Sequence, residues 1–247
     1  QDHFDNCGIS YAQKLQGKDL SYNNFNDADA ALAIVCEFSN PSCVIVKHAN
    51  PCGVASSDNI LQSYKKAFES DCKSAFGGIV ALNRKVDVDL AEEISKIFFE
   101  VIIAPEFSDL AIETLSKKKN LRLLKTNIKK SKNKYEIKTI SGGFLTQEID
   151  NKIINIKDLQ SVSKVKVTDQ ELNELVFAMK ICKYVKSNAI VVSSNFQTIG
   201  IGCGQQNRVD STEIACKKSS KFSNNKFMAS DAFFPFADNI DIAAKYG

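Results

Sequence analysis

A lysine and a histidine stand side by side at positions 47 and 48, directly after the apolar run 43–46. His48 is one of 2 histidines in 247 residues, and an ordinary imidazole exchanges its proton near neutral pH. A neighbouring cation such as Lys47 disfavours protonation of each group, and proteins use this effect to bring bases into working range. The pair predicts either a general base with a cationic partner or an exposed strand end, and both interpretations stay open at this point.

The residues that follow Lys47 and His48 decide whether both side chains can face one site. Successive strand residues point to opposite faces, so Lys47 and His48 can serve one site only where the strand ends or twists. Asn50-Pro51-Cys52-Gly53 follows them, and proline and glycine favour turns. We therefore expect the strand to break in a turn over residues 50–53.

Four further places carry polar groups or glycines that a core does not need. Residues 74–78 end in two glycines before a strand, where a ligand can approach the backbone closely. Glu100 precedes a fully apolar strand. Residues 200–208 share glycines with dinucleotide-binding loops but lack the full pattern, so presentation of Arg208 to an anion is the simpler interpretation. Residues 229–239 place phenylalanines around a proline, which fits a core-anchoring loop and a wall for a flat ligand equally well.

Composition places the chain in a broad class. With 247 residues and 44% hydrophobic content, it can bury a sizeable core in one large or two small domains. A formal charge of +3 gives no argument for nucleic acid or for a membrane surface. No apolar run is long enough to span a bilayer, and no signal pattern opens the chain, so we expect a cytoplasmic protein. The absence of an initial Met suggests a fragment.

The 8 cysteines raise the question of zinc or disulfides. They lie mostly inside apolar segments, and no Cys-x-x-Cys spacing occurs. We interpret them as small buried hydrophobic residues in a reducing cytosol and expect no zinc.

Helical and strand patterns alternate along the chain. Helices are predicted after Ile60, after the acidic segment 87–89 and after the capping box Thr168–Glu171. Their apolar faces are Ile60, Leu61, Tyr64, Ala67 and Phe68; Leu90, Ile94, Ile97 and Phe98; and Leu172, Leu175, Val176, Met179 and Cys182. Strands are predicted at residues 79–82, 101–103, 189–192 and 198–201. This alternation predicts an α/β fold whose sheets are covered by helices.

A lysine-rich stretch, residues 117–138, separates the two halves of the pattern. We interpret it as a solvated loop or excursion between subdomains. A nucleic-acid surface would need interleaved aromatic residues, and only Tyr135 is present.

Several long motifs together carry a family resemblance. They are Val-Lys-His-Ala-Asn-Pro-Cys-Gly (46–53), Ser-Ala-Phe-Gly-Gly-Ile-Val-Ala-Leu (74–82), Glu-Val-Ile-Ile-Ala-Pro (100–105), Lys-Ser-Asn-Ala-Ile (186–190), Ile-Gly-Cys-Gly-Gln-Gln-Asn-Arg (201–208) and Ser-Asp-Ala-Phe-Phe-Pro-Phe (230–236). In this order they resemble the AICAR transformylase domain of bacterial bifunctional purine-biosynthesis enzymes, whose other half is IMP cyclohydrolase. The resemblance runs from residue 15 to the end of the chain.

The resemblance implies a reaction, a fold and an assembly. The reaction is formyl transfer from 10-formyltetrahydrofolate to the 5-amino group of AICAR, giving FAICAR in IMP biosynthesis. The fold is two cytidine-deaminase-like three-layer α/β/α subdomains: residues 1–145, with the lysine-rich excursion, and residues 146–247, expected to be incomplete at the C-terminal end. The assembly is a homodimer with shared active sites. No cyclohydrolase domain is visible in the sequence.

The resemblance also assigns residues by motif. It makes Lys47, His48 and Asn188 catalytic; Gly77, Glu100, Arg208 and Phe233 AICAR-binding; and Phe76, Pro235, Asp238 and Asn239 folate-binding. It places Asp231 near a monovalent-cation site. Relatives often have Asp in place of Glu100, and Ala237 stands where relatives usually have Arg.

The residue types suit that chemistry. The AICAR amine is a weak nucleophile, so a base such as neutral His48 would take its proton as attack proceeds. Lys47 and Asn188 are suited to stabilise the oxyanion, and Lys47 could protonate the departing folate nitrogen. Two rivals remain: a non-catalytic nucleotide-binding or dimerisation module, and a zinc deaminase-like hydrolase. The second needs Pro-Cys-x-x-Cys, and Cys52 has no such partner.

Overall fold

The computed structural model describes residues 8–130, 134–223 and 225–247. Nine strands form one mixed sheet in the order β1-β6-β5-β4-β2-β3-β10-β9-β11, in which β4, β5 and β6 run parallel. The strands are β1 (Gln13–Gln16), β2 (Ser42–Lys47), β3 (Asn50–Ser56), β4 (Ile79–Leu82), β5 (Val101–Ala104), β6 (Arg122–Lys125), β9 (Ile190–Ser194), β10 (Gln197–Gly202) and β11 (Phe227–Ser230).

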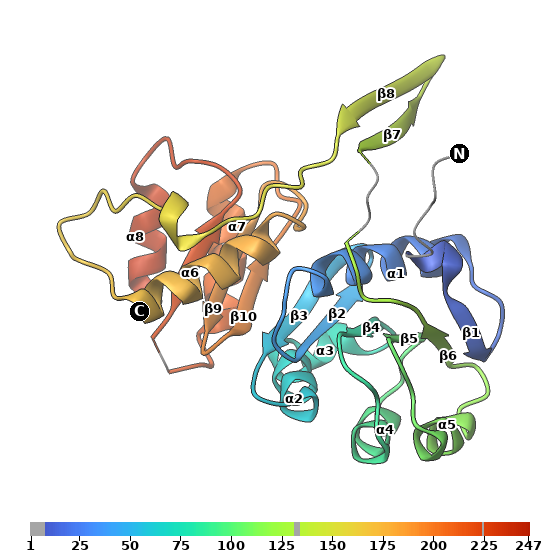
Figure 1. Cartoon of the computed structure of the whole chain (residues 1–247). Helices are drawn as coiled ribbons and strands as arrows, with labels where there is room; N and C mark the ends of the chain where they lie inside the picture. Colours follow the sequence, from blue (N-terminus) through green and yellow to red (C-terminus); the bar gives the residue numbers. More distant parts are fainter. Residues whose placement is uncertain (1–7, 131–133, 224) are drawn as a thin grey trace.

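Helices cover both faces of this sheet, as Figure 1 shows for its first half. The helices are α1 (Tyr22–Val35), α2 (Ile60–Ser70), α3 (Cys72–Ala75), α4 (Val88–Ser95), α5 (Asp109–Ser116), α6 (Asp169–Cys182), α7 (Arg208–Ser219) and α8 (Asp238–Lys245), with short 3-10 turns at Ile9–Tyr11 and Ile156–Asp158. α1 and α6 pack on one face; α2, α4 and α5 pack on the other in the first half, and α7 and α8 in the second. The predicted three-layer α/β/α fold is confirmed.

The alternation of side chains along β2 explains how one strand serves two cores. Val44 and Val46 are buried with α1, whereas Cys43 and Ile45 are buried with α2 and α4. This period of two is that of a strand with both faces covered. The predicted strand over 43–46 is confirmed.

The element order α1-β2-β3-α2-β4 recurs as α6-β9-β10-α7-β11, and the two copies meet where β3 pairs with β10. Glycines let each helix approach its strand closely. A Cβ on Gly53 would lie 1.9 Å from the Ala67 carbonyl oxygen, and one on Gly200 would lie 2.0 Å from that of Ala215. The same element order thus occurs twice within one sheet, and its interpretation as two subdomains stays a prediction. The exact division after residue 145 stays a prediction, and it falls within β8 (Gly143–Glu148).

The turn after Lys47 does not lie where the sequence predicted it. β2 and β3 are joined by a two-residue turn, His48–Ala49, and residues 50–53 already belong to β3. Ile45 pairs with Gly53 and Val46 with Pro51, so Cys52 is the extra residue of a β-bulge. Proline is tolerated there because a bulge interrupts the hydrogen-bond ladder.

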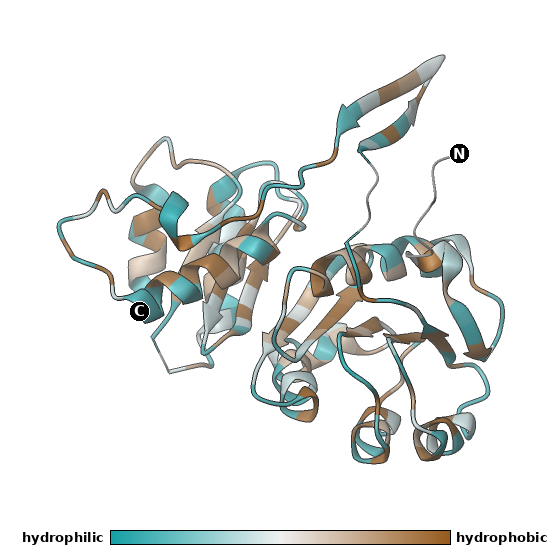
Figure 2. Ribbon diagram, in the orientation of Figure 1, coloured by the Kyte–Doolittle hydropathy of each residue, from teal (hydrophilic) through white to brown (hydrophobic). Residues whose placement is uncertain are grey.

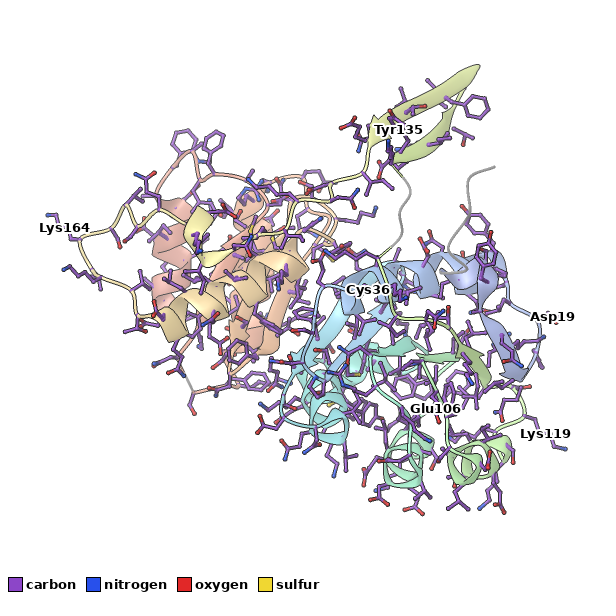
Figure 3. The ribbon with its side chains drawn as sticks, in the orientation of Figure 1. Asp19, Cys36, Glu106, Lys119, Tyr135 and Lys164 are labelled. Atoms are coloured by element: carbon purple, nitrogen blue, oxygen red, sulfur yellow. The ribbon has the colours of Figure 1, made fainter. Side chains whose placement is uncertain are left out.

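The interpretation of 117–138 as a loop is wrong for part of its length. β6 lies inside the sheet between β1 and β5, with Leu123 buried on one face and Leu124 on the other. From residue 135 the chain forms a separate hairpin of β7 (Tyr135–Ile140) and β8, which projects from the body of the molecule (Figure 1). Polar and apolar bands alternate along it (Figure 2), and Tyr135 points into the surrounding space (Figure 3).

Two helical faces differ from their predictions. α4 ends at Ser95, so Ile97 and Phe98 lie beyond it, because the chain leaves the helix to bury Phe99 and enter β5. α6 begins with the predicted Thr168–Glu171 capping box, but its buried face carries Phe177 and Ile181, together with the predicted Cys182. The other predicted members of its stripe, Leu172, Leu175, Val176 and Met179, are half-buried on its flank. The helix over Ile60–Phe68 and the four predicted strands are confirmed.

The cysteines follow their prediction in part. Cys43, Cys182 and Cys216 are buried, and Cys36, Cys52 and Cys203 are half-buried. Cys72 is exposed at the start of α3. Cys7 lies outside the described residues.

Candidate functional site

The predicted site residues come from segments that end or begin at one edge of the sheet. Because β2 is antiparallel to both β3 and β4, the end of β2 lies beside the starts of β3 and β4; the start of β5 follows because β4 and β5 are parallel. The same reasoning through β10, β9 and β11 brings the start of β9 and the ends of β10 and β11 to this edge. Lys47, Gly77, Glu100, Asn188 and Asp231 all adjoin these strand ends.

The Lys47–His48 pair is held in an unusual backbone geometry. His48 and Ala49 both have a φ of 58°, the left-handed region that non-glycine residues adopt at a cost. Two positive φ values suit a two-residue hairpin loop of type I′, where Asn-Gly is the favoured sequence. The side chain of His48 is exposed, while the Lys47 ammonium donates to the Phe76 carbonyl at 2.7 Å. Because His48 lies in the turn, its side chain does not follow the alternation of the strand and need not point away from Lys47.

Asp27, on α1, stabilises this turn. Its carboxylate accepts the backbone N–H of His48 at 2.9 Å and that of Ala49 at 2.8 Å. Hydrogen bonds to a charged acceptor are stronger than neutral ones, so they can offset the backbone cost at both positions. Sequence reasoning missed Asp27, and no local signal in the chain could have found it, because it lies 21 residues from His48.

The first half of the edge continues with Gly77 and Glu100. Gly77 has a φ of 74° and donates its N–H to the Phe98 carbonyl at 2.8 Å. Phe76 is 58% exposed, and its ring contacts the ring of Phe98, at 5.4 Å between centroids. A side chain this exposed beside a glycine leaves a flat surface open to a ligand.

Glu100 is oriented by two neighbours. Asn24 of α1 donates to its carboxylate at 2.6 Å, and the Arg122 guanidinium lies 3.8 Å from the same oxygen. Asn24 is itself buried and also caps α1, because its side chain accepts the Ser21 N–H at 3.1 Å. A fixed carboxylate at the strand start can accept hydrogen bonds from a ligand's hydroxyl or amide groups.

The second half of the edge holds a polar cluster of Asn188, Arg208 and Asp231. Arg208, the first residue of α7, donates to the Asn188 side-chain oxygen at 2.8 Å and to the Asp231 carboxylate. The Asn188 amide donates to the carbonyls of Gln205 and Gln206 at 2.9 and 3.1 Å. The side chain of Arg208 is only 12% exposed. The Asn188 and Asp231 side chains, together with the Ser230 hydroxyl at 2.9 Å, fix the direction of the guanidinium.

The charge on Asp231 is stabilised within this cluster. Burial acts to raise the pKa of its carboxyl, but hydrogen bonds from Ser187 and Arg208 outweigh it and hold that pKa below its ordinary value. Ser187 donates at 2.6 Å and the Ala189 N–H donates at 3.1 Å. Both carboxylate oxygens are therefore engaged by the protein itself.

Asn50 links the two halves of the edge. Its side-chain oxygen accepts the Lys186 N–H at 3.0 Å, and its amide donates to the His48 carbonyl at 3.1 Å. Lys186 is two residues before Asn188, so two hydrogen bonds and a short stretch of backbone connect the His48 carbonyl with Asn188. The structure thus brings Lys47, His48, Asn188 and Arg208 to a common region.

The aromatic segment after β11 is less uniform than predicted. Phe233 and Phe236 are 81% and 74% exposed, and Pro235 is exposed, whereas Phe234 packs into the core under α7 and α8. The core-anchoring interpretation is therefore confirmed for Phe234, and the ligand-wall interpretation stays a prediction for Phe233 and Phe236. Asp238 opens α8, and Asn239 is 2% exposed with its oxygen accepting from Thr212 at 2.8 Å. Asn239 thus has a structural partner inside the protein.

The described residues are 8–130, 134–223 and 225–247. They contain no group of three or more His, Cys, Asp or Glu side chains that could hold a metal ion. None of their helices is long and apolar enough to cross a membrane. The Cys52 thiol donates to the Ile45 carbonyl at 3.4 Å, and burial raises its pKa to about 12.

Comparison with known proteins decides the family. Residues 1–218 match the model of the AICARFT/IMPCHase bienzyme family. The chain belongs to this family. It is similar to the bifunctional purine biosynthesis protein PurH of Caldicellulosiruptor saccharolyticus, with 50% identity over 240 residues that cover 97% of this chain and 47% of the relative.

Other relatives of the AICARFT/IMPCHase bienzyme family agree. PurH of Acetivibrio thermocellus is 48% identical over 242 residues, covering 97% of this chain and 47% of that protein. PurH of Staphylococcus aureus strain JH1 is 46% identical over 239 residues, covering 97% and 49%. The chain spans about half the length of the curated relatives it matches.

Proposed function

We propose that this chain carries out the formyl transfer named by its resemblance, from 10-formyltetrahydrofolate to the amine of AICAR, as a phosphoribosylaminoimidazolecarboxamide formyltransferase. The observation that supports this most is the path from the His48 turn through Asn50 and Lys186 to Asn188 and Arg208. This path supports a shared site for the His48 imidazole, the Lys47 ammonium and the Arg208 guanidinium. Family membership supports the same reaction.

His48 is the proposed base. The AICAR nitrogen forms a bond to the formyl carbon as its proton passes to the imidazole. The exposed position of His48 on a two-residue turn leaves its side chain accessible to that amine. Positive φ at this residue is strain of the kind that proteins hold at functional sites.

Lys47 is the proposed acid and charge stabiliser. The tetrahedral intermediate carries an oxyanion, and the bond from the formyl carbon to the folate nitrogen then breaks. The Lys47 ammonium, now donating to the Phe76 carbonyl, can neutralise the oxyanion and protonate the leaving nitrogen. Its neighbour Phe76 offers the exposed ring for a flat folate.

Arg208 is proposed to recognise AICAR together with Gly77, Glu100 and Phe233, and Asn188 is proposed to position the reacting groups. The Asn188 amide is satisfied by backbone carbonyls and its oxygen by Arg208, so Asn188 acts by fixing Arg208. Pro235 and Asp238 remain proposals for the folate side. A monovalent cation near Asp231, a homodimer with shared sites, and a cytoplasmic location are also proposed on the resemblance.

The test is formyl transfer by the protein in its full natural length, followed by the folate absorbance change. We expect transfer in the wild type and a loss of about 10²–10⁴-fold in His48→Asn, the range that general bases contribute. Asparagine tolerates positive φ, so the turn persists and only the base is lost. AICAR affinity, measured by calorimetry, should stay within a few-fold.

Other results would select another function. AICAR binding without transfer in the wild type would identify a binding or dimerisation module. Release of ammonia from a nucleoside would identify a deaminase-like hydrolase. Full turnover in His48→Asn would keep the reaction and remove His48 as its base.

A further inference from the structure

α1 approaches the proposed site at two points with side chains of one face. Asn24 and Asp27 are three residues apart, so they are neighbours on the helix surface. Asn24 donates to Glu100 at 2.6 Å, and Asp27 accepts from His48 and Ala49 at 2.9 and 2.8 Å. Neither Asn24 nor Asp27 is among the residues assigned by the resemblance.

We propose that Asp27 is a positioning residue for His48, and that Asn24 plays the same part for Glu100. This inference rests on the proposed function, because it deepens the same site. Asp27 contacts the backbone of His48 and not its ring. It acts by holding the turn that aims the imidazole.

The need for Asp27 follows from the residues of the turn. Type I′ loops favour glycine and asparagine because both central residues have positive φ, yet this turn contains His48 and Ala49, at 58° each. Ala49 has no side-chain group that could form the local hydrogen bonds with which asparagine tolerates that region. The two N–H groups face the carboxylate of Asp27, so removing it leaves the turn without its main support.

The need for Asn24 follows from the charge it contacts. The Glu100 carboxylate lies 3.8 Å from Arg122 through one oxygen, the same one that accepts from Asn24. The Asn24 amide therefore fixes the direction of the Glu100 carboxylate, whose side chain is 40% exposed. Asn24 can do so because Ser21 holds the other end of its amide group.

Activity is the first test, in the protein of full natural length. We expect Asp27→Ala to lower kcat by about 10²-fold, the cost of a small misplacement of a catalytic group. The KM for AICAR should change much less. Asp29→Asn, which removes an exposed carboxylate from the same helix, is the matched control and should retain wild-type turnover.

Rescue distinguishes positioning from general damage. In Asp27→Ala, a second change of Ala49→Gly removes the steric cost of positive φ at one position and should restore roughly tenfold in kcat. A structural defect in α1 would not respond to a glycine in a distant turn. Absence of rescue would overturn the proposal.

Hydrogen exchange tests the turn without any turnover. In Asp27→Ala, peptides covering residues 44–54 should exchange faster, whereas peptides from β9 and β10 should not change. Unchanged exchange at the turn would contradict the role of Asp27 even if activity fell. If the wild type transfers no formyl group, the proposed function fails, and this exchange result still decides whether Asp27 holds the turn.

The role of Asn24 is tested by comparing Asn24→Ala with the same change at the neighbouring Asn23. Asn24→Ala should raise the KM for AICAR about tenfold with a smaller change in kcat, because Glu100 is proposed to bind AICAR. A tenfold change in KM corresponds to the loss of one hydrogen bond to a charged group. Asn23→Ala alters an exposed residue of the same type beside it and should leave KM unchanged. A loss confined to kcat would contradict the role assigned to Asn24.

Discussion

The two halves of the molecule each contain a two-residue hairpin turn with positive φ at both positions. In the first half the turn is His48–Ala49, at 58° each; in the second it is Asn195–Phe196, at 51° and 53°. Each is held by a carboxylate from the preceding helix of its half. Asp27 accepts from the first turn, and Glu174 accepts the Phe196 N–H at 2.8 Å.

The difference between the turns lies in their side chains and surroundings. His48 is exposed at the edge where the proposed site residues gather, whereas Phe196 packs edge-on against Phe177, with ring centroids 5.9 Å apart. β3 and β10 are antiparallel, so the start of β10 lies beside the end of β3. The second turn, which precedes β10, therefore lies at the opposite edge of the sheet from the first. The same type of turn thus exposes an imidazole in the first half and packs a phenylalanine into the core in the second.

The largest expected effect on stability comes from the second turn. Phe196→Ala removes a half-buried ring while keeping the backbone donor to Glu174, so the free energy of unfolding should fall by about 2–3 kcal/mol. Urea unfolding measures it through the midpoint, with an unchanged slope. Phe236→Ala, at a 74% exposed ring, is the control. Equal losses in both variants would show that Phe196 does not anchor the core.

Two carboxylates of the second half, Glu174 and Asp231, should respond to pH in opposite directions. Burial raises the pKa of Glu174, against the hydrogen bond from Phe196. Its folded pKa is then above its unfolded value, so the stability it contributes is present in acid and is lost as pH rises through the folded pKa. The advantage of wild type over Glu174→Gln should therefore shrink from acidic to neutral pH.

Asp231 gives the contrasting sign. Its pKa is lowered overall, despite burial, by Ser187 and Arg208. Its stabilisation is therefore complete above the ordinary Asp pKa and is lost as pH falls through the folded value. Thermal unfolding of wild type and Asp231→Asn across acidic pH should show the wild-type advantage growing as pH rises. A constant difference between the two proteins would contradict the ionised Asp231–Arg208 contact.

The smallest effect is expected at Ala49. Ala49→Gly removes the steric cost of positive φ but increases the freedom of the unfolded chain, so it should stabilise by only about 0.5 kcal/mol. Asn195→Gly should gain less, because asparagine already tolerates this region. Thermal unfolding of the pair measures both. A destabilised Ala49→Gly would show that the backbone at the turn is not strained.

The regular pattern of the chain predicted most of the fold. The apolar runs at β2, β4, β5, β9 and β10 and the capping box of α6 all lie where their periodicity placed them. β6 was missed because its two buried leucines stand between two cationic residues, half-buried Arg122 and exposed Lys125. Four residues carry too little periodicity to identify a strand when their flanks are polar.

Only the site residues that lie within sequence motifs could be predicted. Lys47, His48, Asn188 and Arg208 stood out by type and resemblance, and the topology brings them to one edge. The position of the turn was predicted wrongly because Pro51 and Gly53, usual turn residues, serve a bulge within β3. Asp27 and Asn24 could not be found, since their partners are fixed by the packing of α1 against the sheet and not by local sequence.

The central claim is that the first turn serves chemistry and the second serves stability. The most direct test measures the formyl-transfer rate and the unfolding temperature of His48→Asn and Phe196→Ala side by side, each in the full natural length. The account predicts that His48→Asn loses about 10²-fold or more in kcat at an unchanged unfolding temperature, and that Phe196→Ala loses stability and keeps its kcat. Turnover surviving in His48→Asn, or lost equally in both, would contradict it.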